Sequence, residues 1–142
     1  MRSPRPSSQV DLVNLSQAIV ENLSPDLLSP TFARSAMAKT NPLFGHCYIA
    51  SEALYHMAGG KKSGLRPCRL KMPDNQWHWW LVDSDQRIID LTAGQFERRP
   101  QYELGVRAAF LSKRPSARAR KLMARILAAM LREHPESQHR LA

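Results

Sequence analysis

The stretch from residue 47 to residue 91 constrains the fold most, because a helical pattern is followed there by three runs with strand character. Apolar side chains from Cys47 to Ala58 recur at helical spacing and stop at Gly59-Gly60, a common signal for a helix C-terminus. Residues 77–82 are strongly β-prone, and residues 65–72 and 87–91 flank them across polar turns. We therefore expect an α+β fold in which this helix packs on a small antiparallel sheet.

The remainder of the chain predicts one domain with loose ends. A length of 142 residues with 43% hydrophobic residues suffices for one core and is short for two. Residues 1–10 carry little apolar surface, so we expect a disordered arm there, and we expect a flexible tail at 135–142. Between them, within a domain spanning 11–134, the periodicity predicts a first helix from Asp11 to about Leu23, a broken helical connection over 26–40, and a C-terminal helix at about 116–133.

The positive charge is concentrated near the C-terminus. The chain has a formal net charge of +9 and a pI of about 10.3, yet the segment from Arg98 to Arg132 alone holds ten Lys and Arg against one acid, Glu103. A cationic segment of this kind suggests a nucleic-acid or acidic protein partner. The alternative is a solvated helix face whose apolar side packs on the core. The candidate partner-binding residues are Arg118, Arg120, Lys121 and Arg125.

Cysteine content and hydropathy predict a soluble cytoplasmic protein with free thiols. The chain has two cysteines, and its start does not join a basic stretch to a long apolar run. No membrane segment and no cofactor are expected. A metal site made of Cys47, Cys68, His46 and His78 is conceivable, but the CxxC and HxxxH spacings typical of metal ligands are absent from the sequence, so we predict no metal.

Cys47, His78 and Asp90 have the chain order of a thiol nucleophile, its base and the group that orients the base. Cys47 begins the predicted helix, where unpaired N–H groups and the helix dipole favour an anion such as a thiolate. The N–H of the same residue can donate to a developing oxyanion. The alternative for an isolated cysteine on a helix face is a small buried hydrophobe.

His78 and Asp90 lie on neighbouring predicted strands, so their pairing depends on strand parity. Tryptophans around His78 are expected to exclude water and keep its imidazole near neutral, as a general base requires, although a structural role is the alternative. Burial of the Asp90 carboxylate is costly unless a donor such as a histidine N–H pairs with it. A loop of three or five residues between the strands, or one bulge, places both side chains on one face, and we predict this odd count.

Several further residues are candidates around this site. Asn41 lies six residues before Cys47 and its side-chain amide is a candidate second oxyanion donor. Gly45 suits a tight backbone approach before the helix, and His46 is adjacent to the thiol. Trp79 and Trp80 are candidate walls of a substrate cleft, with packing in the core as the alternative. Together, Gly45, His46, Trp79 and Trp80 form the predicted substrate-binding set.

Four motifs carry a family resemblance. The run Asn41-Pro-x-x-Gly-x-Cys47, the Gly59-Gly60 helix end, His78-x-Trp80, and Ile89-Asp-Leu-Thr92 with Gln95-Phe96 resemble the YunG-like family of small bacterial and phage proteins. More distantly, the order of Cys, His and Asp is similar to the transglutaminase-like and papain-like superfamily. The resemblance implies an α+β papain-like core with Cys47 as nucleophile, His78 as base, Asp90 as orienting group and Asn41 at the oxyanion-hole amide. His46 departs from this pattern, in which glutamine is common.

These features predict a cysteine enzyme of acyl transfer at an amide or thioester, such as a protease, amidase or transglutaminase-like enzyme. Its substrate would be a peptide or another amide, a host protein included. The alternative is a non-enzymatic, phage-type binding or inhibitor protein whose basic C-terminal region contacts nucleic acid or an acidic protein. The sequence makes no prediction of oligomeric state.

Overall fold

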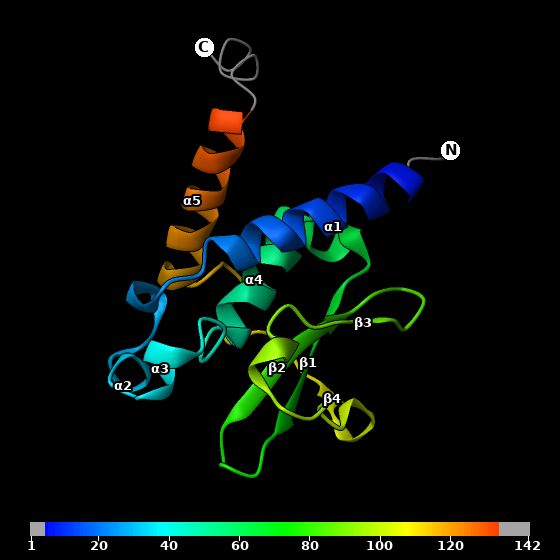
Figure 1. Cartoon of the computed structure of the whole chain (residues 1–142). Helices are drawn as coiled ribbons and strands as arrows, with labels where there is room; N and C mark the ends of the chain where they lie inside the picture. Colours follow the sequence, from blue (N-terminus) through cyan, green and yellow to red (C-terminus); the bar gives the residue numbers. More distant parts are fainter. Residues whose placement is uncertain (1–4, 134–142) are drawn as a thin grey trace.

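The fold is α+β, with helices on one side of a four-stranded antiparallel sheet (Figure 1). The structure is a computed structural model, and it describes residues 5–133. The helices are α1 (Arg5–Glu21), α2 (Pro30–Ala33), α3 (Met37–Thr40), α4 (Cys47–Met57) and α5 (Ala117–Glu133), and the strands are β1 (Arg66–Lys71), β2 (Trp77–Val82), β3 (Ile88–Ile89) and β4 (Val106–Arg107). Short 3₁₀ turns are η1 (Pro25–Leu27), η2 (Gly60–Ser63), η3 (Ala93–Gln95) and η4 (Tyr102–Leu104). The predicted fold class, α+β with a small antiparallel sheet, is confirmed.

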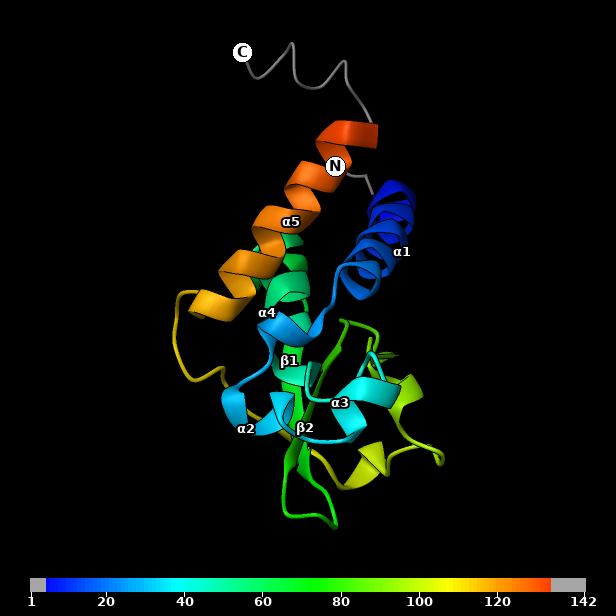
Figure 2. The same ribbon diagram turned by 60° about the vertical axis from the view of Figure 1, so that its left-hand side comes forward.

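Helix α4 lies at the centre of the molecule. It contacts β1 and β2 on one side and α1 and α5 on the other, as Figure 2 shows for the helices. Every residue from Ile49 to Leu54 is therefore buried, although an amphipathic helix on an open sheet would expose one face. The core joins these elements through Ile19, Leu54, Leu81, Leu122 and Ile126, none of which is exposed.

The sheet has the strand order β3-β2-β1-β4, and all three pairings are antiparallel. Leu81 of β2 faces the core beneath α4, whereas the opposite face holds a smaller cluster of Cys68, Trp80 and Val82. Gly105, next to β4, is required by this cluster, because a Cβ atom there would lie 2.3 Å from Trp80 Cη2. The sheet thus separates two apolar clusters, and the second one adjoins the site described below.

The element boundaries mostly agree with the periodicity. Helix α4 ends where Gly59 adopts a φ of +120°, which confirms the predicted helix end. The predicted connection over 26–40 consists of η1 and the two short helices α2 and α3. Two differences stand out: β3 has only two residues, and β4 was not predicted. Strand β4 has little strand pattern of its own, and it forms because β1 offers a free edge at Cys68 and Arg69.

Helix α1 begins earlier than its sequence pattern indicates. Asp11 was expected to cap the helix, but helical conformation starts at Arg5, inside the segment expected to be a disordered arm. Once the apolar turns after Asp11 are packed, each added residue gains a backbone hydrogen bond, and Pro6 is tolerated in a first turn. Residues 1–4 and the predicted tail at 135–142 lie outside the described residues.

Helix α5 is capped by its predicted first residue and packs on the core. The Ser116 hydroxyl accepts from the Ala119 N–H at 3.3 Å. Its buried residues, Ala119, Leu122 and Ile126, share one face. The predicted amphipathic helix is therefore confirmed. Among the helices of residues 5–133, none is apolar and long enough to cross a membrane.

Candidate active site

The register between β2 and β3 brings His78 and Asp90 to one face of the sheet. Leu81 pairs with Ile89 and Val82 with Ile88, so five residues, 83–87, lie between the paired positions. The predicted odd count is therefore confirmed. Its local cause is a tight turn in which Gln86 N–H donates to the Asp83 carbonyl and Gln86 adopts a φ of +65°.

Asp90 accepts hydrogen bonds from three other residues. His78 Nε2 lies 2.6 Å from Asp90 Oδ2, and the Tyr102 hydroxyl donates to the same oxygen at 2.7 Å. The Thr92 N–H donates to Asp90 Oδ1 at 3.2 Å. The His78 and Asp90 side chains are 2% and 3% exposed, so this hydrogen bonding compensates a carboxylate that would otherwise be costly to bury.

Cys47 lies on the other side of His78. It is the first residue of α4 and is half-buried, with Sγ 3.7 Å from the carbonyl oxygen of Trp77, the residue before His78. The Cys47 side chain is also close enough to His78 to raise the pKa of the ring. Because Nε2 is engaged by Asp90, Nδ1 is the ring nitrogen left for the thiol. The Cys47 sulfur, the His78 imidazole and the Asp90 carboxylate therefore lie close together.

The pKa of His78 differs from the value expected for a neutral imidazole. Burial lowers the pKa of this imidazole, but hydrogen bonds with Asp90 and Cys47, together with their negative charges, outweigh burial and raise the pKa to about 9. The aromatic surroundings were expected to keep the ring near neutral. The protonated form of the ring is instead favoured, because Asp90 and Cys47 act on it at close range. Phe96 and Trp80 still enclose it, with ring centroids 4.7 Å and 5.8 Å away.

The side chain of Asn41, the predicted second oxyanion donor, fixes the loop before α4. Asn41 Oδ1 accepts from the Leu43 N–H at 3.1 Å, and Asn41 Nδ2 donates to the Gln95 carbonyl at 3.1 Å. The amide of Asn41 thus links this loop to η3. One of its two N–H bonds is engaged, which leaves one for the oxyanion role predicted for it.

Gly45 and His46 face the interior at the helix start. Gly45 has a φ of +78°, and a Cβ atom there would lie 2.9 Å from Leu28 Cδ2, so packing accounts for this glycine. The buried His46 has its Nε2 3.0 Å from the Ser24 carbonyl oxygen, which makes Nε2 the donor. Gly45 thus packs against Leu28 and Phe32, and the His46 side chain is buried against Ser24, so neither residue offers a side chain to a substrate.

The tryptophans of β2 divide between core and surface. Trp79 and Trp80 are buried, which is the packing alternative that the sequence left open. Trp79 stacks on Phe110 at 5.7 Å, and Trp80 meets Tyr102 edge-on at 5.0 Å. Trp77 is 40% exposed and has the Arg69 guanidinium 4.1 Å from its ring centroid. Trp77 is therefore the tryptophan with surface open to a ligand beside Cys47.

The second cysteine and the basic helix have structural contacts. Cys68 is buried in β1, and burial raises the pKa of its thiol. Lys121 and Arg125 both pair with the carboxylate of Asp26, with Lys121 Nζ at 2.9 Å, and these pairs hold η1 against α5. Arg118 and Arg120 are exposed. Two of the four predicted partner-binding cations thus have an internal acidic partner.

Two buried hydrogen-bonding contacts were missed from the sequence. Tyr102 follows an irregular stretch, and nothing in its spacing connects it to Asp90. Glu52 is fully buried on α4 and accepts from both the Ser116 N–H, at 3.1 Å, and the Ser116 hydroxyl, at 2.6 Å. A signal for Glu52 did exist, because a lone acid in an otherwise apolar helix stretch requires a buried donor.

The fold and this site define a small α+β protein in which a cysteine at a helix N-terminus lies beside a strand histidine that is hydrogen-bonded to an aspartate. A family model described as YunG protein matches residues 11–134, so the chain belongs to the YunG family. None of the curated proteins compared with the chain matches it, and none of the solved structures does.

Proposed function

We propose that this protein is a cysteine enzyme that transfers an acyl group from an amide or thioester, with a papain-like or transglutaminase-like arrangement of its core. The observation that carries the proposal is the proximity of these three groups: Asp90 Oδ2 lies 2.6 Å from His78 Nε2, and Cys47 Sγ lies 3.7 Å from the carbonyl oxygen of the residue before His78 and raises the pKa of the ring. The nucleophile begins a helix and its partners come from an adjacent antiparallel sheet, which is the arrangement that the superfamily resemblance implies.

The raised pKa of His78 indicates how the proton moves. A protonated His78 ring beside the sulfur and the N-terminus of α4 would both stabilise a thiolate, and in the proposed mechanism the thiolate of Cys47 is the attacking species. The sulfur adds to the carbonyl carbon, and the first N–H groups of α4 stabilise the oxyanion. His78 then gives its proton to the leaving amine or thiolate as the bond to the carbonyl carbon breaks.

Release of the acyl group reverses the role of His78. The ring, now neutral, takes a proton from water or an acceptor amine as that group attacks the thioester. The sulfur leaves as thiolate and restores the ion pair. Asp90 keeps Nε2 protonated throughout, so Nδ1 alone exchanges protons with the reacting groups.

Alkylation by iodoacetamide at pH 7, followed by peptide mass spectrometry, tests the activated nucleophile. We expect Cys47 to react at least about tenfold faster than a free thiol, and His78→Ala to remove this advantage. Cys68 in the same chain serves as an internal reference for a buried thiol. The control variant is His56→Ala, which removes a histidine near the opposite end of α4. Equal rates for wild type and His78→Ala would refute the proposal.

The acyl-transfer step itself is tested by trapping. Incubation with a panel of activated amides and thioesters should leave an acyl mass on the peptide containing Cys47, and Cys47→Ser should leave none.

We propose the cytoplasm as the compartment of this activity. Both cysteines are unpaired in the structure, which is the state expected of thiols in a reducing compartment.

The alternative function, binding of nucleic acid or an acidic protein through α5, has less support. Asp26 already engages Lys121 and Arg125, which leaves Arg118 and Arg120 as the exposed cations of the predicted set. A filter-binding titration against salt checks it: binding through this face should weaken steeply with salt and strengthen in Asp26→Asn. Absence of DNA and RNA binding at low ionic strength would remove the nucleic-acid version.

A further inference from the structure

An exposed strip crosses the sheet on the face that carries α4. Strand β2 contributes Trp77, which is 40% exposed and shares this face with the buried Trp79 two residues further on. Directly opposite residues of paired strands also share a face, so Arg69 and Lys71 of β1 and Val106 of β4 continue the strip. The hairpin of β1 and β2 extends beyond the start of α4 (Figure 1), so the helix does not cover this end of the face. We call these four residues, Arg69, Lys71, Trp77 and Val106, the Arg69 strip.

Two contacts connect the Arg69 strip to the start of α4. Cys47 Sγ lies 3.7 Å from the carbonyl oxygen of Trp77. Tyr48, the next residue of α4, meets Trp79 edge-on, with ring centroids 4.9 Å apart. The Arg69 guanidinium contacts both tryptophans, because its Cζ lies 4.1 Å from the ring centroid of Trp77 and 5.5 Å from that of Trp79. Trp77 therefore contacts both the proposed nucleophile and the guanidinium.

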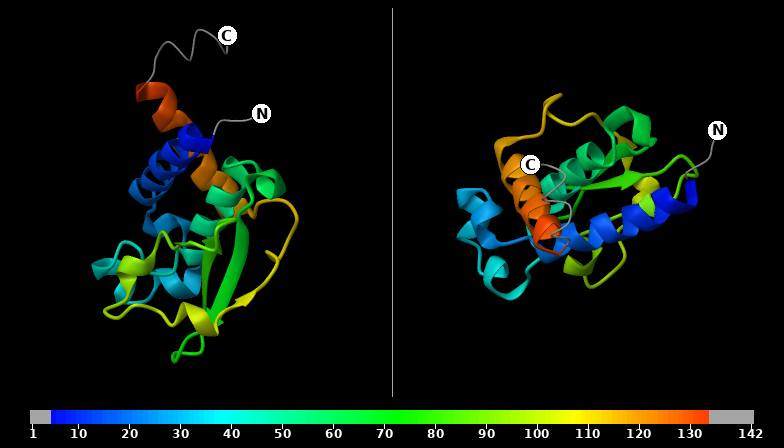
Figure 3. Two further views of the ribbon diagram at one scale, coloured as in Figure 1. Left: turned by 90° about the vertical axis from the view of Figure 1, so that its right-hand side faces the viewer. Right: turned by 90° about the horizontal axis from the view of Figure 1, so that it is seen from above.

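The segment after β4 adds apolar surface at the same end of α4. It runs beside the sheet toward α5, as the left panel of Figure 3 shows. Its Leu111 N–H donates to the Tyr48 hydroxyl at 2.7 Å, and its Phe110 stacks on Trp79 at 5.7 Å. These contacts hold the segment against the first turn of α4, where the Leu111 side chain is 80% exposed. A peptide at Cys47 would therefore meet apolar surface as well as a cation.

The charge of Arg69 is not neutralised by an acid of the chain. Within residues 5–133, Arg69 forms no ion pair, and its buried Nε has no hydrogen-bond partner. Stacking on an aromatic ring engages the face of a guanidinium and leaves its in-plane terminal N–H groups able to bind a carboxylate. Lys71 Nζ, 5.5 Å from the ring centroid of Trp77, adds a second positive charge. Asp74, in the turn of the same hairpin, accepts from the Gln76 N–H at 3.0 Å and pairs with neither cation.

We propose that the Arg69 strip binds an acidic side chain of a peptide substrate whose acyl carbonyl is attacked by Cys47. This inference rests on the proposed acyl-transfer function and adds a substrate class to it. The carboxylate would pair with Arg69, and the neighbouring apolar part of the peptide would lie on Trp77 and Val106. A basic side chain at the same position would be repelled by Arg69 and Lys71, so the strip would also select against basic peptides.

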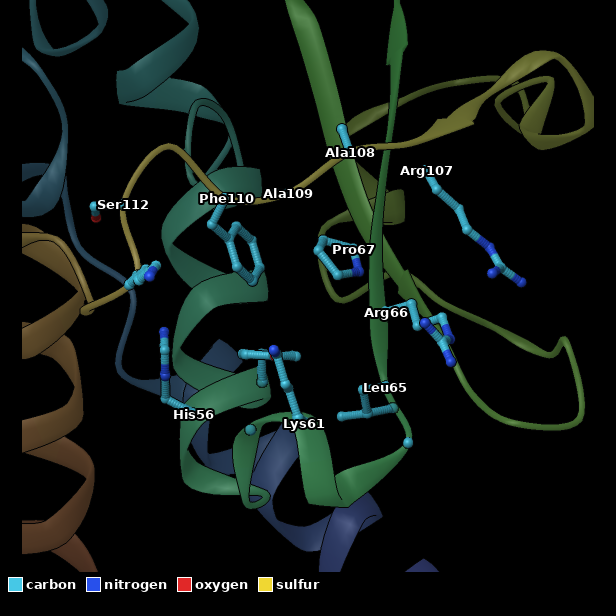
Figure 4. A pocket seen from close by; sticks show the side chains of 14 residues that line it. His56, Lys61, Leu65, Arg66, Pro67, Arg107, Ala108, Ala109, Phe110 and Ser112 are labelled. Carbon is cyan, nitrogen blue, oxygen red and sulfur yellow. The ribbon is translucent and has the colours of Figure 1, made fainter.

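Alkylation of Cys47 by two matched reagents tests the anion site without acyl transfer. Iodoacetate and iodoacetamide are similar in size and differ in charge, so the ratio of their rates at low ionic strength reports on cations near the sulfur. Arg69→Gln should lower the ratio of iodoacetate to iodoacetamide rates at least about twofold, whereas Arg66→Gln should change it less than about 1.3-fold. Arg66 is exposed on the same strand, and the register and Figure 4 place it on the face away from α4. Equal ratios in the two variants would overturn the inference.

Peptide thioesters that differ in one side chain test the substrate class. In three matched sets, a glutamate, glutamine or lysine occupies the first, second or third residue before the thioester carbonyl. In at least one set, we expect the glutamate peptide to acylate Cys47 at least about fivefold faster than the glutamine peptide, with the lysine peptide slowest, and Arg69→Glu to reverse this order. Equal rates for the three peptides in every set would overturn the substrate class.

The two measurements separate this inference from the proposed function. If none of the thioesters acylates Cys47 but Arg69→Gln still lowers the alkylation ratio, acyl transfer is wrong and the anion site stands. If the thioesters acylate Cys47 without a preference for glutamate, acyl transfer stands and the acidic substrate class is wrong. Circular dichroism checks folding, and Lys71→Gln, at an exposed position of the Arg69 strip, replaces Arg69→Gln if that variant unfolds. An alkylation ratio unchanged by Lys71→Gln would then overturn the inference.

Discussion

At the scale of single residues, the contact between His78 and Asp90 is the most informative feature of this protein. A carboxylate that is 3% exposed is retained because His78, Tyr102 and Thr92 each donate to it. In turn, Asp90 fixes which nitrogen of His78 carries its proton. The chemistry assigned to Cys47 therefore depends on residues that never touch the sulfur.

The raised pKa of His78 predicts that stability falls with rising pH. A histidine with a folded-state pKa of about 9 and a reference value of 6.5 stabilises the fold fully below about pH 6.5 and loses this contribution as pH rises through about 9. The loss should amount to about 3 kcal/mol at most. Urea unfolding at pH 6, 7.5 and 9 measures it. In Asp90→Asn this dependence should shrink by more than half, and an unchanged slope would contradict the assignment.

Tyr102 is predicted to be a positioning residue for Asp90. Tyr102→Phe removes one donor to a buried carboxylate and should lower the free energy of unfolding by about 1–3 kcal/mol. It should also slow alkylation of Cys47, but less than His78→Ala, because His78 and Thr92 still hold Asp90. Added salt, or a buffer that contains no phenol, is not expected to restore the alkylation rate of this variant. Tyr55→Phe is the control, and equal effects of the two variants on Cys47 alkylation would show that Tyr102 is only structural.

At the scale of elements, α4 performs two tasks at different positions. Its first residue supplies the sulfur, and Glu52, one and a half turns later, accepts from the N-cap of α5. An anion at a helix N-terminus is favourable, because the first N–H groups of a helix lack intrahelical partners. This contact fixes α5 against α4.

The contact between Glu52 and Ser116 predicts a measurable contribution to stability. Ser116→Ala removes the hydroxyl that caps Ala119 and donates to Glu52, so it should cost about 1–2 kcal/mol of unfolding free energy. Chemical denaturation followed by circular dichroism measures this loss. Ser112→Ala is the control, because Ser112 is exposed and bonds only to the nearby Arg114 carbonyl. A loss no larger than that of the control would refute the capping role.

Helices were more predictable than strands at this scale. The apolar spacing of α4 and the glycines after it are local signals, and both agree with the structure. Strand β4 and the two-residue length of β3 depend on which edge of β1 or β2 is free, a property of the assembled sheet. The early start of α1 at Arg5 likewise reflects extension of a packed helix and not a cap.

At the scale of the whole molecule, one core connects the helices to the sheet. Ile19 of α1, Leu54 of α4, Leu81 of β2 and Leu122 of α5 are buried in the same cluster. Because the three tryptophans all lie on β2, their fluorescence reports on the sheet, whereas circular dichroism at 222 nm reports mainly on the helices.

These two probes are predicted to give the same unfolding curve. Urea unfolding followed by tryptophan fluorescence and by circular dichroism should show one transition with the same midpoint, because the shared core prevents either layer from unfolding alone. The same comparison in Ser116→Ala should shift both curves together. Separate midpoints for the two probes would show that the helical layer and the sheet unfold independently.

The sequence by itself determined the α+β class, the position of Cys47 at a helix start, the strand character around His78 and Asp90, and the uneven distribution of charge, because these follow from local spacing and composition. Only the tertiary structure decided that the pKa of His78 is raised, that Tyr102 and Thr92 support Asp90, and that two of the basic residues of α5 form ion pairs with Asp26. Those properties depend on distances of a few ångströms between segments far apart in the chain, and such distances arise only when the core has packed.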